Sequence, residues 1–264
     1  MNLMISKLWN SFASQARLMW FYVKQFASVS YFIQLMVIST VTVTFVQNMG
    51  VRAWGGDPVM LCNRSAIIGL WSTSIAAAGI IGFERNRGTL VHLLVGKISL
   101  PRVFFAIVSS ASSFGLLAFP VAWTTWILLD GNLDIIAQLS FTQFVWDLGY
   151  IFLLWLGAVS VASVVASIFV LTPNAISYEQ LLLVPVFILS GLLFTGSHVP
   201  NWIAYTRFII PLGTPSKMLL NNSPASLADF ILSTLSIIVW FALAYFFAQK
   251  AIKKATQMGT LEVI

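Results

Sequence analysis

A short charged segment stands between two long apolar stretches of this chain: Gly82-Phe83-Glu84-Arg85-Asn86-Arg87-Gly88-Thr89-Leu90-Val91-His92-Leu93-Leu94. One acidic and two basic residues fall within four positions, and a Gly-Thr pair and a short amphipathic run follow them. Charged side chains are costly inside lipid, so the segment is expected at the membrane surface. A segment placed there is available to a soluble partner, which makes it the first candidate for a functional site.

The composition around this segment indicates an integral membrane protein. Of the 264 residues, 59% are hydrophobic and only 8% are charged, whereas a soluble domain carries about 25% charged residues. Backbone in lipid must satisfy its own hydrogen bonds, which leaves helices or a closed barrel. Apolar runs of about 20 residues favour helices, because barrel strands need only about 9–11. We therefore expect an all-α membrane protein with one transmembrane domain over residues 1–264.

Six apolar runs are long enough to be transmembrane helices. They cover residues 28–49, 60–82, 103–128, 142–170, 179–197 and 227–249, and a tail at 250–264 follows. Residues 5–25 precede them as an amphipathic helix with a Trp/Met/Phe face opposite a basic polar face. This pattern is typical of a helix that lies in the membrane interface, and a soluble helix packed on the rest of the protein is the alternative.

The basic residues predict the orientation. With both termini in the cytoplasm, ten Lys and Arg fall inside and four fall outside, as the positive-inside rule requires. Orientation and anionic membrane lipids then explain the net charge of +6 better than nucleic acid does. We expect a multi-pass protein of the inner (plasma) membrane, with the charged segment on the cytoplasmic side.

A proline-rich segment at about 198–226 separates the last two expected spans. It contains four prolines, so it is too broken to be a span, yet it is too apolar for a free loop. Two short helices that dip into the outer leaflet fit this pattern. The sequence therefore predicts a re-entrant extracellular hairpin between spans five and six.

Catalytic and metal-binding patterns are scarce. The two histidines, His92 and His198, fall on opposite sides of the membrane in this topology, so they cannot share a metal or a catalytic triad. The chain has no phosphate loop of the form Gly-x-x-x-x-Gly-Lys-Ser/Thr, so we expect no ATP hydrolysis by this chain alone. Arg64 and Glu179 lie near span ends, where they can snorkel to water. The lack of a clear mid-membrane acid argues against an ion-coupled carrier.

Uncharged polar residues on the first span are a second candidate site. Thr40, Thr44 and Gln47 share one helical face, and such a stripe either lines a pathway or forms hydrogen bonds between helices. In the fourth span Ala158, Ala162 and Ala166 recur at every fourth position, which indicates close packing.

The charged segment resembles the Glu-x-x-x-Gly-Thr motif after the second span of type-2 ABC exporter permeases. Residues 181–220, with Leu189-Ser190-Gly191-Leu192-Leu193-Phe194, Val199-Pro200-Asn201-Trp202-Ile203 and Pro211, resemble that family's fifth span and re-entrant hairpin. The order of elements agrees over nearly the whole chain.

The resemblance implies that residues 88–97 form a cytoplasmic coupling helix that docks in a groove of a separate ATPase subunit; a helix resting on lipid is the alternative. The residues implied in coupling are Glu84, Arg85, Arg87, Gly88, Thr89, Leu90, Leu93 and Leu94. The implied partners are two ATPase subunits, which use ATP and Mg, a second copy of this chain or a similar permease, and membrane lipids. This chain itself would bind no cofactor.

The first and fifth spans, with the hairpin, would line the path, and the expected lining residues are Thr40, Thr44, Gln47 and Phe194. An aromatic-rich, uncharged path favours a hydrophobic or amphipathic cargo, such as a drug, an antimicrobial peptide or a lipid-like molecule. Export of a lipid-linked polysaccharide and ion-coupled secondary transport are the alternatives.

Overall fold

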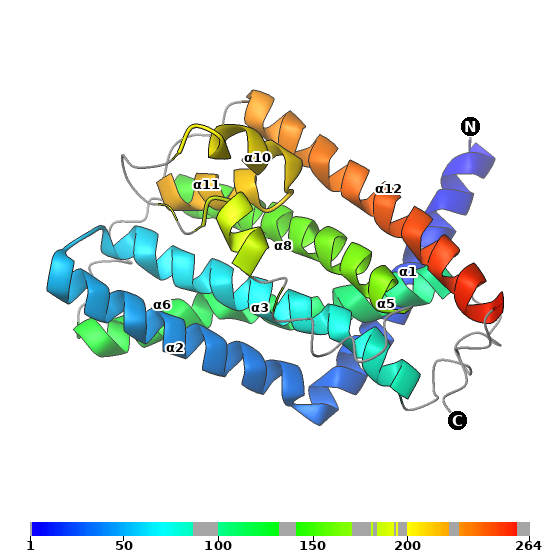
Figure 1. The fold of residues 1–264 in the computed structure, drawn as a ribbon, viewed down its shortest axis with the longest axis horizontal. Coiled ribbons are helices and arrows are strands. Elements are labelled where there is room, and N and C mark those ends of the chain that lie inside the picture. Colours follow the sequence, from blue (N-terminus) through cyan, green and yellow to red (C-terminus); the bar gives the residue numbers. More distant parts are fainter. Residues whose placement is uncertain are drawn as a thin grey trace.

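The structure is a computed structural model that describes residues 2–86, 100–131, 141–170, 181, 184–192, 194, 200–221 and 227–257. All regular elements in these ranges are helices (Figure 1). They are α1 (Asn2–Val29), α2 (Tyr31–Trp54), α3 (Pro58–Asn86), α5 (Leu100–Ser113), the 3-10 turn η1 (Phe114–Leu117), α6 (Ala118–Asp130), α8 (Phe141–Phe169), α10 (Ile203–Ile209), α11 (Gly213–Asn221) and α12 (Leu227–Gln257). The expected all-α class is confirmed.

Five of the described helices are long and apolar enough to cross a membrane. They are Tyr31–Trp54, Pro58–Gly82, Pro101–Asp130, Thr142–Phe169 and Leu227–Ala251. Each corresponds to one of the six spans expected from the sequence. The remaining expected span, 179–197, lies largely outside the described residues.

The described part of that expected fifth span contains a helix that ends early. Residues 184–189 are helical, and Gly191, with φ 80°, follows their last turn. Leu192 N donates to Phe187 O at 3.1 Å, and Gly191 N donates to Ile188 O at 3.1 Å. This pair of bonds is a Schellman motif, which ends a helix with glycine in the left-handed conformation. The helix therefore stops before the expected boundary at 197.

Helix α1 is longer than the expected 5–25 and crosses the ends of the spans at a steep angle (Figure 1). It is separated from α2 by Ser30, which adopts a left-handed conformation with φ 52°. Gln15 Nε2 donates to Arg102 O at 3.0 Å, and Ser110 Oγ donates to Met19 O at 2.8 Å. These bonds attach α1 to α5, while Trp20 and Phe21 stay exposed.

The third span is interrupted near its middle. The 3-10 turn η1 lies between α5 and α6, and Pro120 sits in the first turn of α6. Proline lacks an N–H, and its ring clashes with the carbonyl four residues earlier, here that of Leu116. The helix tightens locally to a 3-10 turn at that point. The break therefore lies upstream of the proline and not at it.

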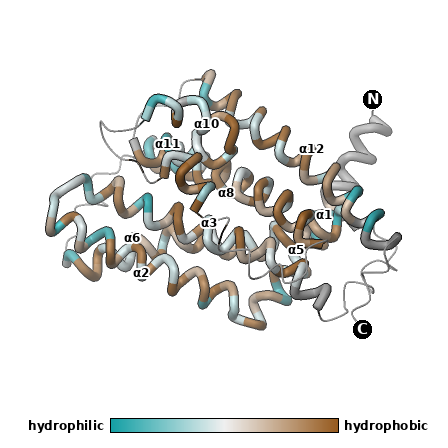
Figure 2. Tube along the Cα trace, viewed as in Figure 1, coloured by the Kyte–Doolittle hydropathy of each residue, from teal (hydrophilic) through white to brown (hydrophobic). Residues whose placement is uncertain are grey.

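Helix α3 is the centre of the bundle. In its membrane-crossing window 83% of the residues are buried, whereas the corresponding shares are 28% for α2 and 17% for α12. It packs against α2, α5, α6, α8 and α11. By contrast, α12 packs mainly on α8; the helix is largely hydrophobic (Figure 2), and many of its large apolar side chains are exposed. Gly69 and Gly115 permit this close packing, because a Cβ at either position would lie 3.0 Å or less from an atom of a neighbouring helix.

The helices define two ends of the molecule (Figure 1). At one end lie the α1–α2 link, the end of α3, the start of α5 and the end of α12. At the other end lie the α2–α3 link, the end of α6, α10 and α11. The end of α3, where the charged segment begins, and the two short helices α10 and α11 thus lie at opposite ends of the molecule.

Candidate functional site

The charged segment begins as a continuation of α3. The expected span ended at residue 82, but the backbone stays helical through Asn86, so Glu84 and Arg85 lie on the last turn of the same helix. Glutamate and arginine are good helix formers, which explains why the helix does not stop where the apolar run stops. The other expected coupling residues lie outside the described residues: Arg87, Gly88, Thr89, Leu90, Leu93 and Leu94.

Two of the expected pathway residues face the interior of the chain. Thr40 and Thr44 are fully buried, with Asn48 on the same face of α2. The Thr40 hydroxyl packs on Gly69 of α3 and has no hydrogen-bond partner, while Thr44 Oγ1 donates to the Thr40 carbonyl at 2.7 Å. Among the described residues, neither side chain forms a hydrogen bond to another helix, and Gln47 is only half-buried beside this face.

Phe194, the remaining expected pathway residue, lies beyond the Schellman turn and not on a helix. It is half-buried, and its ring meets that of Trp202 edge-on, with centroids 6.2 Å apart. This contact joins it to the residue directly before α10. The structure therefore places Phe194 with the two short helices and does not bring it together with Thr40 and Thr44 in one cluster of contacts.

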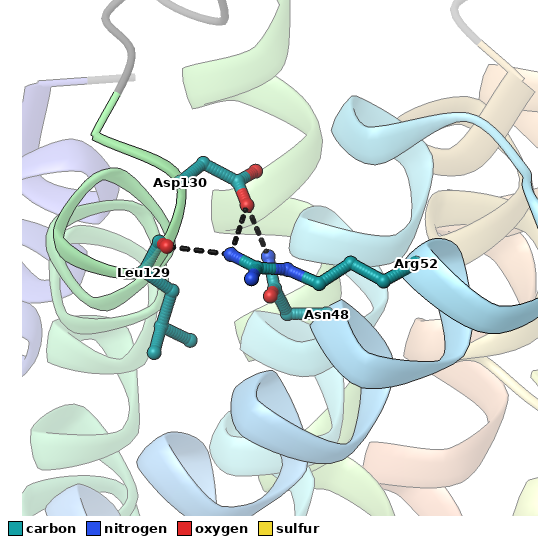
Figure 3. Close-up of polar contacts among 4 residues, drawn as sticks. All are labelled: Asn48, Arg52, Leu129 and Asp130. Carbon is teal, nitrogen blue, oxygen red and sulfur yellow. Dashed lines mark hydrogen bonds and ion pairs between the residues drawn. The ribbon is translucent and has the colours of Figure 1, made fainter.

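A polar network connects α2 to the end of α6 (Figure 3). Asp130 Oδ1 accepts from Asn48 Nδ2 at 2.8 Å and from Arg52 Nη2 at 3.1 Å. Arg52 Nη2 also donates to Leu129 O at 2.6 Å. A cation at the last carbonyls of a helix satisfies unpaired acceptors and complements the helix dipole. The network holds two spans together at the end that carries α10 and α11.

Asn63 forms a second polar link at this end. Its Nδ2 donates to Leu219 O of α11 at 3.2 Å, and its Oδ1 accepts from Trp123 Nε1 of α6 at 3.2 Å. Both side-chain groups of this buried amide are thus occupied, and one residue of α3 connects α6 to α11. Sequence reasoning missed it, because its partners are 60 and 156 residues away.

Arg64 does not snorkel to water as its position near a span end suggested. The residue is 8% exposed, and its Nε and Nη2 atoms are buried without a hydrogen-bond partner. In the described part of the chain Arg64 is therefore a largely buried cation with two buried donor atoms, Nε and Nη2, that form no hydrogen bond.

The described residues offer no metal site, since no three His, Cys, Asp or Glu side chains gather among them. The two polar links at Asp130 and Asn63 are structural, because their groups are paired with one another. Comparison of the chain with protein-family models, curated proteins and solved structures found no match.

Proposed function

We propose that this chain is the transmembrane permease subunit of a type-2 ABC exporter, which moves a hydrophobic or amphipathic substrate with ATPase subunits on separate chains. The observation that carries the proposal is the Glu84-Arg85-Asn86-Arg87-Gly88-Thr89-Leu90 segment directly after the second span. It begins on a rigid helical extension of that span, so a force applied there acts on α3 itself. The partner subunits bind the ATP and Mg.

The distribution of charge supports a cytoplasmic position for this segment. Six exposed or half-buried basic residues belong to the end of the molecule that carries it: Arg17, Lys24, Arg102, Lys250, Lys253 and Lys254. Arg52 and Lys217 lie at the other end. Positive residues favour the cytoplasmic side, so this proposal puts both chain termini in the cytoplasm of the cell and α10 and α11 outside.

The central position of α3 explains how movement of an ATPase subunit would reach the other spans. Movement of an ATPase against residues 88–97 would push on the end of α3, which packs against α2, α5, α6 and α8. Packed helices move as discrete bodies and not by continuous deformation. Separation of α2 from α3 would uncover Thr40 and Thr44, which face α3 in the described arrangement. A path lined by these residues would thus open between α2 and α3 only during the transport cycle.

The proposal is tested by isolating a tagged chain from its native membrane. We expect it to bring down a protein with a Gly-x-x-x-x-Gly-Lys-Ser/Thr loop, to hydrolyse ATP only in that complex, and to respond to substrate by a change in ATPase rate. Leu90→Ala should weaken the association or abolish the response of the ATPase, because it removes an apolar contact from the docking face.

Leu128→Ala is the matched control, since Leu128 is 84% exposed at the opposite end of the molecule and should leave the ATPase unaffected. A folded Leu90→Ala complex with normal transport, or a purified chain without any ATPase partner, would refute the assignment.

A further inference from the structure

Arg64 is the basis of the inference, because it is a largely buried cation and two of its donor atoms form no hydrogen bond in the described part of the chain. Its Nε and Nη2 atoms have no hydrogen-bond partner, and the residue is 8% exposed. In the described part of the chain Asp130 pairs with Arg52 and Asn48, and the neighbouring Asn63 is occupied by Leu219 and Trp123. Neither group forms a hydrogen bond with Arg64 Nε or Nη2 among the described residues.

This state is unfavourable for the chain alone. A guanidinium stays protonated in proteins, so burial cannot be relieved by loss of the charge. A buried charge without a partner is strongly destabilising, and membrane proteins pair such groups or use them for function. A ligand that supplies negative charge and hydrogen-bond acceptors would remove the penalty.

The identity of the unused donors indicates the shape of that ligand. Nε–H and one N–H of Nη2 lie on the same edge of the planar guanidinium and point in parallel directions. This edge forms two hydrogen bonds with two oxygens of one carboxylate or phosphate group. The structure thus leaves a bidentate edge unoccupied, and not merely a single donor.

The depth of Arg64 favours phosphate. It lies six residues after Pro58, the first residue of α3, which is about 9 Å along the helix. The window Pro58–Gly82 is about 37 Å long against a hydrocarbon core of about 30 Å, which puts Arg64 within about one helical turn of the lipid headgroups. Phosphate is the abundant anion at that level, and Arg52 and Lys217 at the same end of the molecule attract it further.

We propose that Arg64 is a binding site for a phosphate group, carried by a membrane lipid or by a solute. Both donor atoms are closed from solvent, so the phosphate enters when the covering side chains move, and binding stabilises the moved arrangement. The site does not depend on the proposed transport function, because it requires neither nucleotide nor an ATPase.

The test uses the purified full chain in a neutral detergent, with binding followed by calorimetry and by the melting temperature. One arm adds dihexanoyl phosphatidylglycerol, and the other adds inorganic phosphate. We expect the wild type to bind and to melt at a higher temperature in at least one arm. A response to the lipid alone identifies a lipid site, and a response to both probes or to inorganic phosphate alone identifies a site open to solutes.

Arg64→Met should lower the affinity for the probe roughly 10- to 100-fold, the loss expected for hydrogen bonds to a charged group. Without any ligand, the melting temperature of this variant should be no lower than that of the wild type. Arg64→Lys keeps the charge but not the bidentate edge, so it should bind with intermediate affinity and serves if the methionine variant does not fold. Lys254→Met removes one positive charge from an exposed residue at the opposite end of the molecule and should keep the response.

The proposal is overturned if the wild type responds to neither probe, or if Arg64→Met and Arg64→Lys bind as the wild type does. Loss of self-association in Arg64→Met, with no response of the wild type to phosphate or lipid, would instead assign the partner of Arg64 to a carboxylate of a second copy.

Discussion

At the residue scale, the closest approach of three helices depends on the missing side chain of Gly69. A Cβ at this position would collide with the Thr40 hydroxyl of α2 and lie 3.0 Å from the Ala118 Cβ of α6. Gly69→Ala should therefore destabilise the protein by about 1–3 kcal/mol, as overpacking does. The measurement is thermal unfolding in detergent, followed by tryptophan fluorescence.

Gly50→Ala is the control for this change, because the nearest atoms to its Cβ belong to the Trp54 ring at 3.8 Å. It should be neutral or stabilising by up to about 1 kcal/mol, since alanine is the better helix former. Equal melting temperatures for the two variants would contradict the packing of α2 on α3 at Gly69.

A second residue-scale prediction concerns Asp130. Asp130→Ala removes the acceptor of Asn48, which is 3% exposed, and should cost about 1–3 kcal/mol because a buried donor is left unpaired. Arg52→Ala should cost less, about 0–1 kcal/mol, because the Arg52 side chain is 60% exposed and solvent screens the ion pair. Chemical denaturation of both variants gives the order, and a larger loss for Arg52→Ala would show that the ion pair dominates the network.

At the element scale, the sequence predicted which segments cross the membrane better than where each helix ends. Apolar runs located the five described spans, because the hydrocarbon core sets their length. Hydropathy does not predict backbone conformation outside the lipid. The sequence therefore missed two features: the continuation of α3 to Asn86 and the early end of a helix at Gly191. The pairing of Asn63 depends on distant elements, α6 and α11, which periodicity within one span cannot reveal.

The two short helices give a prediction at this scale. A Cβ on Gly157 of α8 would lie 2.7 Å from the Pro211 carbonyl oxygen, between α10 and α11. The contact is with backbone, so Gly157→Ala should displace that turn and lower stability by about 1–3 kcal/mol. Gly149→Ala, on the same helix with no atom within 4 Å, should be neutral or stabilising.

Limited proteolysis alongside thermal unfolding would detect the displacement, because a turn lifted from α8 exposes cleavable backbone. Equal protease resistance and melting temperature of the Gly157 and Gly149 variants would show that this turn does not depend on its contact with α8.

At the scale of the whole molecule, the buried helix α3 runs from the end where the charged segment begins to the end that carries α10 and α11. Helix α3 carries Glu84 and Arg85 at one end and Asn63 and Arg64 near the other. Through Asn63 it is joined directly to α11, so a displacement of α3 along its axis would reach the short helices. This continuity gives the charged segment a physical route to the opposite face of the membrane.

The proposed orientation of the molecule in the membrane can be measured. A cysteine at Trp54, which is 87% exposed, should react with a membrane-impermeant maleimide in right-side-out vesicles. A cysteine at Lys253, which is exposed near the end of α12, should react only after permeabilisation. The single native Cys62 is 1% exposed and should add little background. The opposite labelling pattern would place Glu84 outside the cell, where no ATP-dependent partner could act on α3.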